Sequence, residues 1–189
     1  MKKHLLFLLI IMFYGCTESN LAFHPRLNPS SGTLELVQTF GGSKNDVAKS
    51  VVSTVDGGFA VLGYTQSLDG DITDKATEDY DFWMLKFNSE AQLEWNKTYG
   101  GSGDDRGSSI IETSDGGYAL LGYSDSSDGD ISSNNGNRDF WLVKINDSGG
   151  VAWEKSFGYG GVDEGVSIIE TSDNHLMLSG ILDVTASGG

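Results

Sequence analysis

The chain has 189 residues and is strongly acidic, with 27 Asp and Glu residues against 12 Lys and Arg residues and a formal net charge of −15 at pH 7. Phosphate binding needs a basic surface, so this balance argues against nucleic acid as a partner. The single cysteine excludes a disulfide framework and a cysteine-based zinc site. Abundant glycine and scarce proline indicate a turn-rich β protein.

The N-terminal residues 1–15 predict an export signal, because a basic start precedes an apolar run over residues 5–14. This run of about 10 residues is too short for a membrane-spanning helix. The signal ends in Gly15-Cys16 and resembles the lipobox of bacterial lipoproteins, with Phe13 where leucine is usual. The resemblance implies cleavage before Cys16, fatty acylation of this residue, and a membrane anchor in the cell envelope of a Gram-negative bacterium, at the outer membrane. The alternative is a buried apolar strand with an incidental cysteine.

Residues 16–32 lack periodicity and predict a lipidated tether. The region 33–189 then repeats itself with a period of about 58–59 residues, which is typical of solenoids, propellers and arrays. Three anchors recur in consecutive copies: Asp56–Phe59 as Asp115–Tyr118, Asp69–Ile72 as Asp128–Ile131, and Asp81–Trp83 as Asp139–Trp141.

Each complete unit predicts four strands, at residues 50–55, 59–64, 82–87 and 93–99, and again at 109–113, 118–123, 140–145 and 151–157. A third copy predicts the first two strands, at 167–171 and 176–181. The second strands are apolar on both faces and should be buried, whereas the fourth strands alternate and should be half exposed. Tight Asp-Gly-Gly hairpin turns join the first two strands, through Gly57, Gly58, Gly116 and Gly117.

Four antiparallel strands per unit predict an all-β fold of β-propeller blades, with a solenoid as the alternative. The expected divisions are an orphan outer strand at 33–40, unit one at 41–99, unit two at 100–157 and a partial unit three at 158–189. Because a propeller ring needs about 4–8 blades, we expect an incomplete ring of about two and a half blades. A truncated chain is the favoured explanation; ring closure by several chains and an open array are the alternatives.

The repeat pattern resembles the tandem repeats of secreted and surface-anchored bacterial β-propeller proteins of the seven-bladed, SBBP-like type. The resemblance is carried by Trp95–Ser102, Asp115–Tyr118, Gly122–Ser124 and Asp139–Lys144, and it covers residues 33–189. It implies a propeller at the cell surface and is nearly silent on biochemistry.

The loops after the second and fourth strands should open on one face, where acidic residues gather; loops held by a rigid scaffold commonly carry function. Calcium is one hypothesis there, because carboxylate oxygens suit this hard cation. The candidate ligands are Asp69, Asp71, Asp125, Asp128 and Asp130. Their spacing is not that of an EF-hand, and the alternative is solvated turns whose aspartates accept backbone hydrogen bonds.

Other repeated residues predict structural roles. Tryptophans at equivalent positions favour a core between units over a sugar-stacking platform: Trp83, Trp95, Trp141 and Trp153. Asp81 and Asp139 should tie loop backbone at the strand entrance, and the repeated Lys86 and Lys144 should be ion-paired.

The sequence does not match common catalytic motifs, because no histidine is placed for a catalytic triad or for a pair of metal ligands. We therefore expect no enzyme and no cofactor beyond calcium. The sequence predicts a lipid-anchored envelope protein with a structural or binding role toward a glycan or protein ligand. The alternatives are a carbohydrate-binding, lectin-like propeller, a calcium-stabilised adhesin, and an accessory module of a secreted hydrolase.

Overall fold

A computed structural model describes residues 20–23, 26–27, 34–36 and 38–184, and every element assigned in them is a β-strand. The export signal, Cys16 and most of the tether lie outside these residues, so lipidation stays a prediction. Among the described residues, no helix has the length and apolar character needed to cross a membrane.

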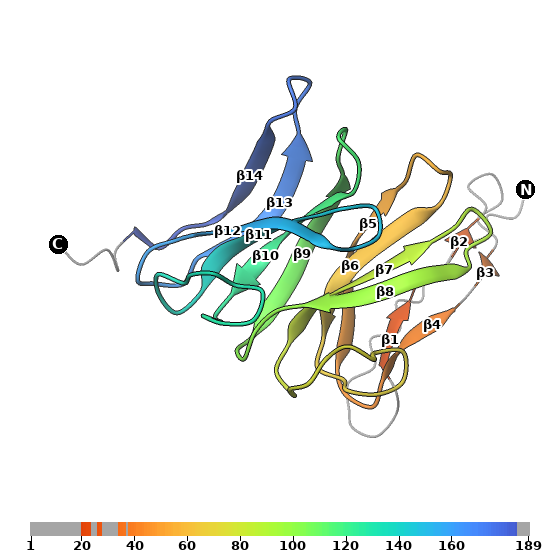
Figure 1. The fold of residues 1–189 in the computed structure, drawn as a ribbon. Helices are drawn as coiled ribbons and strands as arrows, with labels where there is room; N and C mark the ends of the chain where they lie inside the picture. The colour runs from red at the N-terminus through yellow and green to blue at the C-terminus, as the bar shows by residue number, and fades with distance from the viewer. Residues whose placement is uncertain (1–19, 24–25, 28–33, 37, 185–189) are drawn as a thin grey trace, which may run out of the picture.

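Two four-stranded antiparallel sheets form the centre of the molecule (Figure 1). The first sheet contains β5 (Asp46–Ser53), β6 (Phe59–Thr65), β7 (Asp81–Phe87) and β8 (Leu93–Tyr99), paired in this order. The second sheet repeats the order with β9 (Asp105–Glu112), β10 (Tyr118–Ser124), β11 (Asp139–Ile145) and β12 (Val151–Phe157). The third sheet pairs β13 (Glu164–Glu170) with β14 (Leu176–Ile181).

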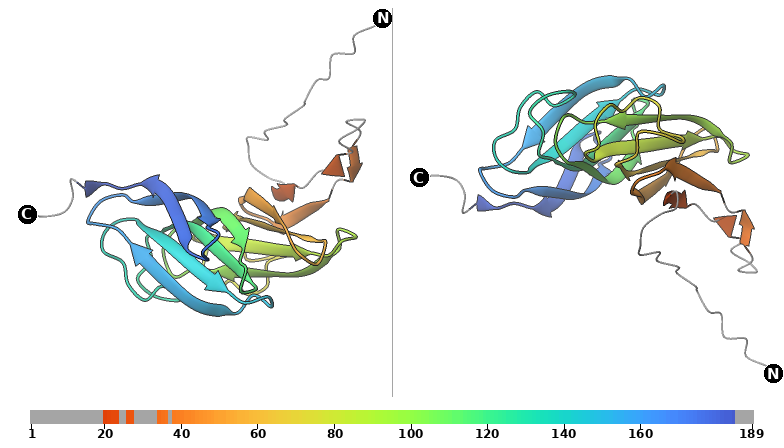
Figure 2. Two further views of the ribbon diagram at one scale, coloured as in Figure 1. Left: turned by 90° about the horizontal axis from the view of Figure 1, so that it is seen from above. Right: turned by 90° about the horizontal axis from the view of Figure 1, so that it is seen from below.

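The N-terminal strands lie beside the first sheet (Figure 2). Here β1 (Asn20–Phe23) pairs with β4 (Thr39–Gly42), and β2 (Arg26–Leu27) pairs with β3 (Leu34–Leu36). The sequence did not predict β1 and β2, because this segment has no periodic apolar pattern. The segment predicted as one orphan strand contains β3 and β4 instead.

In the first two units, the second, third and fourth strands lie where the sequence predicts them, and so does the second strand of the third unit. The first strands of all three units begin earlier than predicted. Their early residues are hidden from pattern analysis because the register shifts between Ala48 and Ser50 opposite β6, with similar shifts in the next two sheets. The first strand passes so close to the second that a Cβ at Gly63 would lie 1.7 Å from the Val47 carbonyl oxygen. Glycine is therefore required at this position of the second strand.

Neighbouring sheets pack face to face, with β9 against the first sheet and β13 against the second. The first interface buries Phe82, Met84, Leu120 and Trp141, and the Phe82 and Trp141 rings meet edge to face at 4.7 Å. The second interface is smaller and has Leu121 at its centre. Each such interface removes apolar surface from water, which is the main force that holds the sheets together.

The four repeated tryptophans do not share one environment. Trp83 and Trp141 are 1% and 0% exposed, and Trp95 packs partly buried against Tyr118. Trp153 is 41% exposed, so the expected core position is wrong for this residue. The third sheet has Leu176 where the second has Tyr118, so the partner ring that Trp95 meets is replaced by an aliphatic side chain at the equivalent position.

The strand β14 also differs from the prediction that every second strand is buried. Met177 and Ile181 are 57% and 58% exposed, whereas β10 is buried throughout. In the described part of the chain β14 pairs only with β13, so nothing covers the flank that β11 covers on β10.

Candidate functional site

Two loops of each unit are fastened together at one edge of the sheets. In the first unit, Asp69 accepts the Ser43 backbone N–H at 2.7 Å, and Asp71 accepts that of Gly41 at 2.8 Å. Gly70 lies between the two aspartates with φ +69°, a conformation that glycine adopts without steric cost. The loop after β6 is thereby held against the turn before β5.

The second unit repeats this arrangement. Asp128 accepts the Ser102 N–H at 2.7 Å, Asp130 accepts the Gly100 N–H at 3.1 Å, and Asp125 accepts the Asp104 N–H. The sequence predicted aspartates that accept backbone hydrogen bonds within their own turn. The real partners lie in a different loop, and no local pattern reveals that pairing.

These contacts decide how the candidate calcium ligands are placed. Each candidate carboxylate is bonded to a different backbone amide. Within residues that the structure describes, no three His, Cys, Asp or Glu side chains are arranged to hold a metal. The five candidate calcium ligands therefore fasten the loops to each other. Their carboxylates are spread along the exposed edge instead of converging on one point.

Three aspartates of the acidic loops are buried. Asp46, Asp105 and Asp163 are 6%, 0% and 0% exposed and stand at or just before the start of a first strand. Asp105 accepts the Gly101 N–H and the Ser126 hydroxyl, both at 2.8 Å. The exact recurrence of an aspartate before each first strand is the signal that could have revealed this role.

Burial raises the pKa of Asp46 and Asp105. Burial raises the pKa of Asp105 to about 6, although hydrogen bonds from Ser124, Gly101 and Ser126 act in the opposite direction. Burial also raises the pKa of Asp46, against hydrogen bonds from Thr65 and Gly42.

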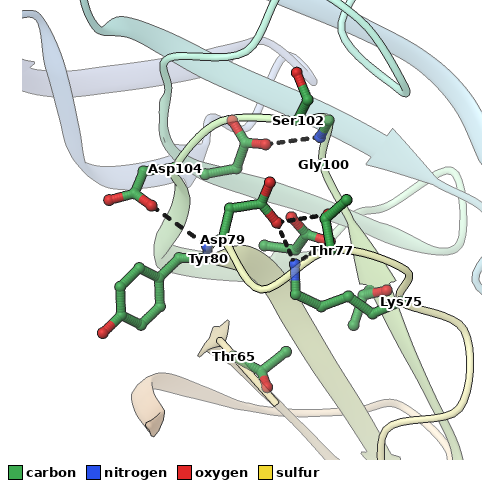
Figure 3. A network of polar contacts seen from close by, with 12 residues as sticks. Thr65, Lys75, Thr77, Asp79, Tyr80, Gly100, Ser102 and Asp104 are labelled. Atoms are coloured by element: carbon green, nitrogen blue, oxygen red, sulfur yellow. Dashed lines mark hydrogen bonds and ion pairs between the residues drawn. The ribbon is translucent and has the colours of Figure 1, made fainter. Parts of the chain in front are cut away.

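The aspartates at the start of the third strands differ between units. Asp139 accepts the Asn135 backbone N–H at 2.6 Å, as the sequence predicts. Asp81 instead pairs with Lys75 at 3.0 Å. The side chain of Lys75 is buried and also contacts Asp79 at 2.8 Å (Figure 3). Burial raises the pKa of Asp81 to about 7 despite Lys75, and the charge of Asp105 adds to this rise.

The opposite edge carries the Asp-Gly-Gly turns. Gly57, Gly116 and Gly117 have φ of 85°, 89° and 75°, and a Cβ at Gly58 would lie 2.1 Å from the Phe87 carbonyl oxygen. Glycine is needed in these turns because three of the positions have a positive φ and the fourth leaves no room for a Cβ.

The repeated lysines hold these turns. Lys86 contacts Asp56 at 2.7 Å and Glu94 at 2.9 Å, and Lys144 contacts Asp115 at 3.1 Å. Burial by itself would lower the pKa of Lys86, but its hydrogen bonds to Asp56 and Glu94 outweigh this effect and raise it.

No protein-family model and no curated protein sequence matches this chain. The structure alone therefore defines the class of this protein. It is an all-β repeat of antiparallel sheets, in which acidic loops are fastened together along one edge.

Proposed function

We propose that the protein is a lipid-anchored cell-envelope protein whose sheets are blades of a β-propeller, about two and a half of them, and whose acidic loop edge binds a ligand. The anchor rests on Gly15-Cys16 after the apolar run. The blade assignment is supported by the four-stranded antiparallel order of the first two sheets and by the face-to-face packing of all three.

The loop fastening is the observation that carries the binding role. In each of the first two units, two such hydrogen bonds join residues that lie 26 and 30 positions apart in sequence. Loops held in this way lose little conformational entropy on binding, and such preorganisation improves affinity. Exposed carboxylates along this edge suit a cationic or polyhydroxylated surface.

Anchoring and binding are tested separately. Replacing Cys16 by serine in the full-length protein should abolish incorporation of labelled palmitate and move the chain out of the membrane fraction. For binding, the probe is isolated cell envelope from the host. D74N and E78Q at the exposed loop edge should lower retention of the protein more than D147N and E90Q at the opposite edge. Unchanged fractionation of C16S, or equal retention of the two pairs, would contradict the respective half of the proposal.

A glycan ligand is the second candidate, favoured by exposed aromatic side chains at one end of the molecule. Trp153, Phe157 and Tyr159 are 41%, 45% and 44% exposed and come from β12 and the turn after it. Aromatic faces combine apolar area with a rigid shape, which suits stacking on sugar rings. A glycan array should show binding that W153A removes. The control variant W95F, at the equivalent but partly buried position of the first sheet, should retain this binding. An array without any signal would discard this candidate.

A further inference from the structure

The outer edge of β14 is an unprotected strand edge. In the described part of the chain β13 is its only partner, whereas the equivalent strands β6 and β10 are paired on both sides. Native proteins commonly protect such edges with charged residues or proline, and β14 contains neither. The row of backbone N–H and C=O groups along this edge can therefore pair with another extended strand.

The surface beside this edge lacks the cover that the first unit has. Tyr99 of β8 is 2% exposed, and its hydroxyl donates to the Gly149 carbonyl, in the turn after β11, at 2.9 Å. A Cβ at Gly149 would lie 3.1 Å from the Trp95 ring, so one turn lies over both rings. The equivalent rings of β12 are Phe157 and Trp153, which are 45% and 41% exposed. Among the described residues, no third strand of the third sheet covers them.

The free edge and the uncovered rings belong to one site. At the preceding junction β11 serves both, because it pairs with β10 and buries Trp141 in the same core as Tyr99. The third sheet packs on the second as the second packs on the first. A strand added to β14 would therefore lie over Phe157 and Trp153, and it would extend the existing core of the second interface.

A charge at the end of this site is also without its usual partner. In the first two units, the lysine at the sixth position of the third strand pairs with the aspartate of the Asp-Gly-Gly turn, at 2.7 and 3.1 Å. The third unit has Asp173 in this place. Within residues 38–184, no lysine is ion-paired with Asp173, and its carboxylate lies 3.2 Å from His175 Nδ1 instead. An added strand with a lysine at its sixth position would place an ammonium beside Asp173.

We propose that the β14 edge is a docking site for an extended segment of a partner polypeptide, which adds antiparallel to β14 as the third strand of the third sheet. The segment that fits resembles β7 and β11, which are buried throughout, with aromatic residues at the second and third positions and lysine at the sixth. In such strand addition, backbone hydrogen bonds provide affinity and side-chain pockets provide specificity. The proposal does not depend on the ligand of the acidic loop edge. A sugar stacked on Trp153 would leave the β14 edge unpaired, so the glycan candidate is separable from it.

The probe is a labelled synthetic peptide with the sequence of residues 139–150, which covers β11 and the turn after it. The full-length protein should bind this peptide saturably, and the complex should melt at a higher temperature. Amide exchange in β14 should slow in the complex, because its outer N–H groups become hydrogen-bonded. W153A and F157A should each weaken binding by about tenfold or more. V55A, at a 95% exposed apolar position of the first unit, should bind as the unmodified chain does.

A charge exchange tests the position of the lysine. A peptide with K144E should bind several-fold more weakly, because its carboxylate would face Asp173. D173K in the protein should recover part of this loss. E78K makes the same charge change at the opposite edge of the sheets and should recover none of it.

Four results would overturn the proposal. One is the absence of saturable binding to the unmodified chain. Another is binding that W153A and F157A leave unchanged. The third is binding that does not slow amide exchange in β14, because the peptide would then contact side chains without adding a strand. The fourth is equal binding of the K144E peptide to D173K and E78K.

Discussion

Replacing Lys75 by methionine should be one of the most destabilising single changes in the protein. The side chain of Lys75 is 0% exposed, and its ammonium lies 2.8 Å from Asp79 and 3.0 Å from Asp81. Methionine retains most of the apolar stem but removes the charge, so the buried carboxylate of Asp81 loses its cation. Removing one partner of a buried ion pair costs about 3–5 kcal/mol.

The size of this loss should depend on pH in a defined direction. In the folded chain the pKa of Asp81 is raised from 3.8 to about 7, so folding favours the neutral carboxyl. Stability from this group is therefore complete below the unfolded pKa of 3.8 and is lost as the pH rises through about 7. Near pH 5 Asp81 is already largely neutral, so K75M should cost only about 1–2 kcal/mol there, mostly through lost hydrogen bonds. Above pH 7 the full loss should return.

Urea unfolding of K75M at several pH values measures both effects. The matched control is K44M, because Lys44 pairs with Glu78 at 3.5 Å with the two side chains 47% and 64% exposed. Such a surface pair contributes about 0–1 kcal/mol. The double variant K75M/D81N should recover part of the lost stability. The reasoning fails if K75M costs no more than K44M, or if its cost does not fall on acidification.

Two further comparisons use pairs of equivalent residue types. W141A should destabilise by about 3–5 kcal/mol, because Trp141 is 0% exposed in the first interface, whereas W153A at a 41% exposed position should cost much less; equal unfolding midpoints would refute this packing. G122A should cost about 1–3 kcal/mol or more, because its Cβ would lie 2.7 Å from Phe82 Cζ and closer still to backbone. G116A meets nothing within 4 Å and should cost about 1–2 kcal/mol through its φ of +89° alone; thermal melts in which G116A is the worse variant would contradict the assignment.

The strands were predictable because their signals are local. Apolar runs such as Phe59–Thr65 and the turns at Asp56 and Asp115 are encoded within a few residues, and repetition strengthens each of them. The alternation in Leu93–Tyr99 likewise placed the fourth strand at a sheet edge, where it lies.

The site was only partly predictable because its contacts join distant loops. An aspartate beside a glycine is typical of a solvated turn. The residues near Asp105 in sequence do not indicate that the Ser124–Ser126 segment covers this aspartate in the folded chain. Trp153 shows that a repeated motif does not by itself determine burial. Its own motif repeats that of Trp95, but its burial depends on the residue that the next sheet presents, and that residue is Leu176.

The packing of each first strand onto the preceding sheet has a consequence for how the chain folds. The strand β9 packs against the first sheet, and β13 packs against the second. Folding should therefore propagate from the first sheet toward the third, with each sheet serving as the template for the one that follows it in the chain. Stability should be graded along the chain in the same sense, so that amide exchange is slowest in β6 and β10 and fastest in β14.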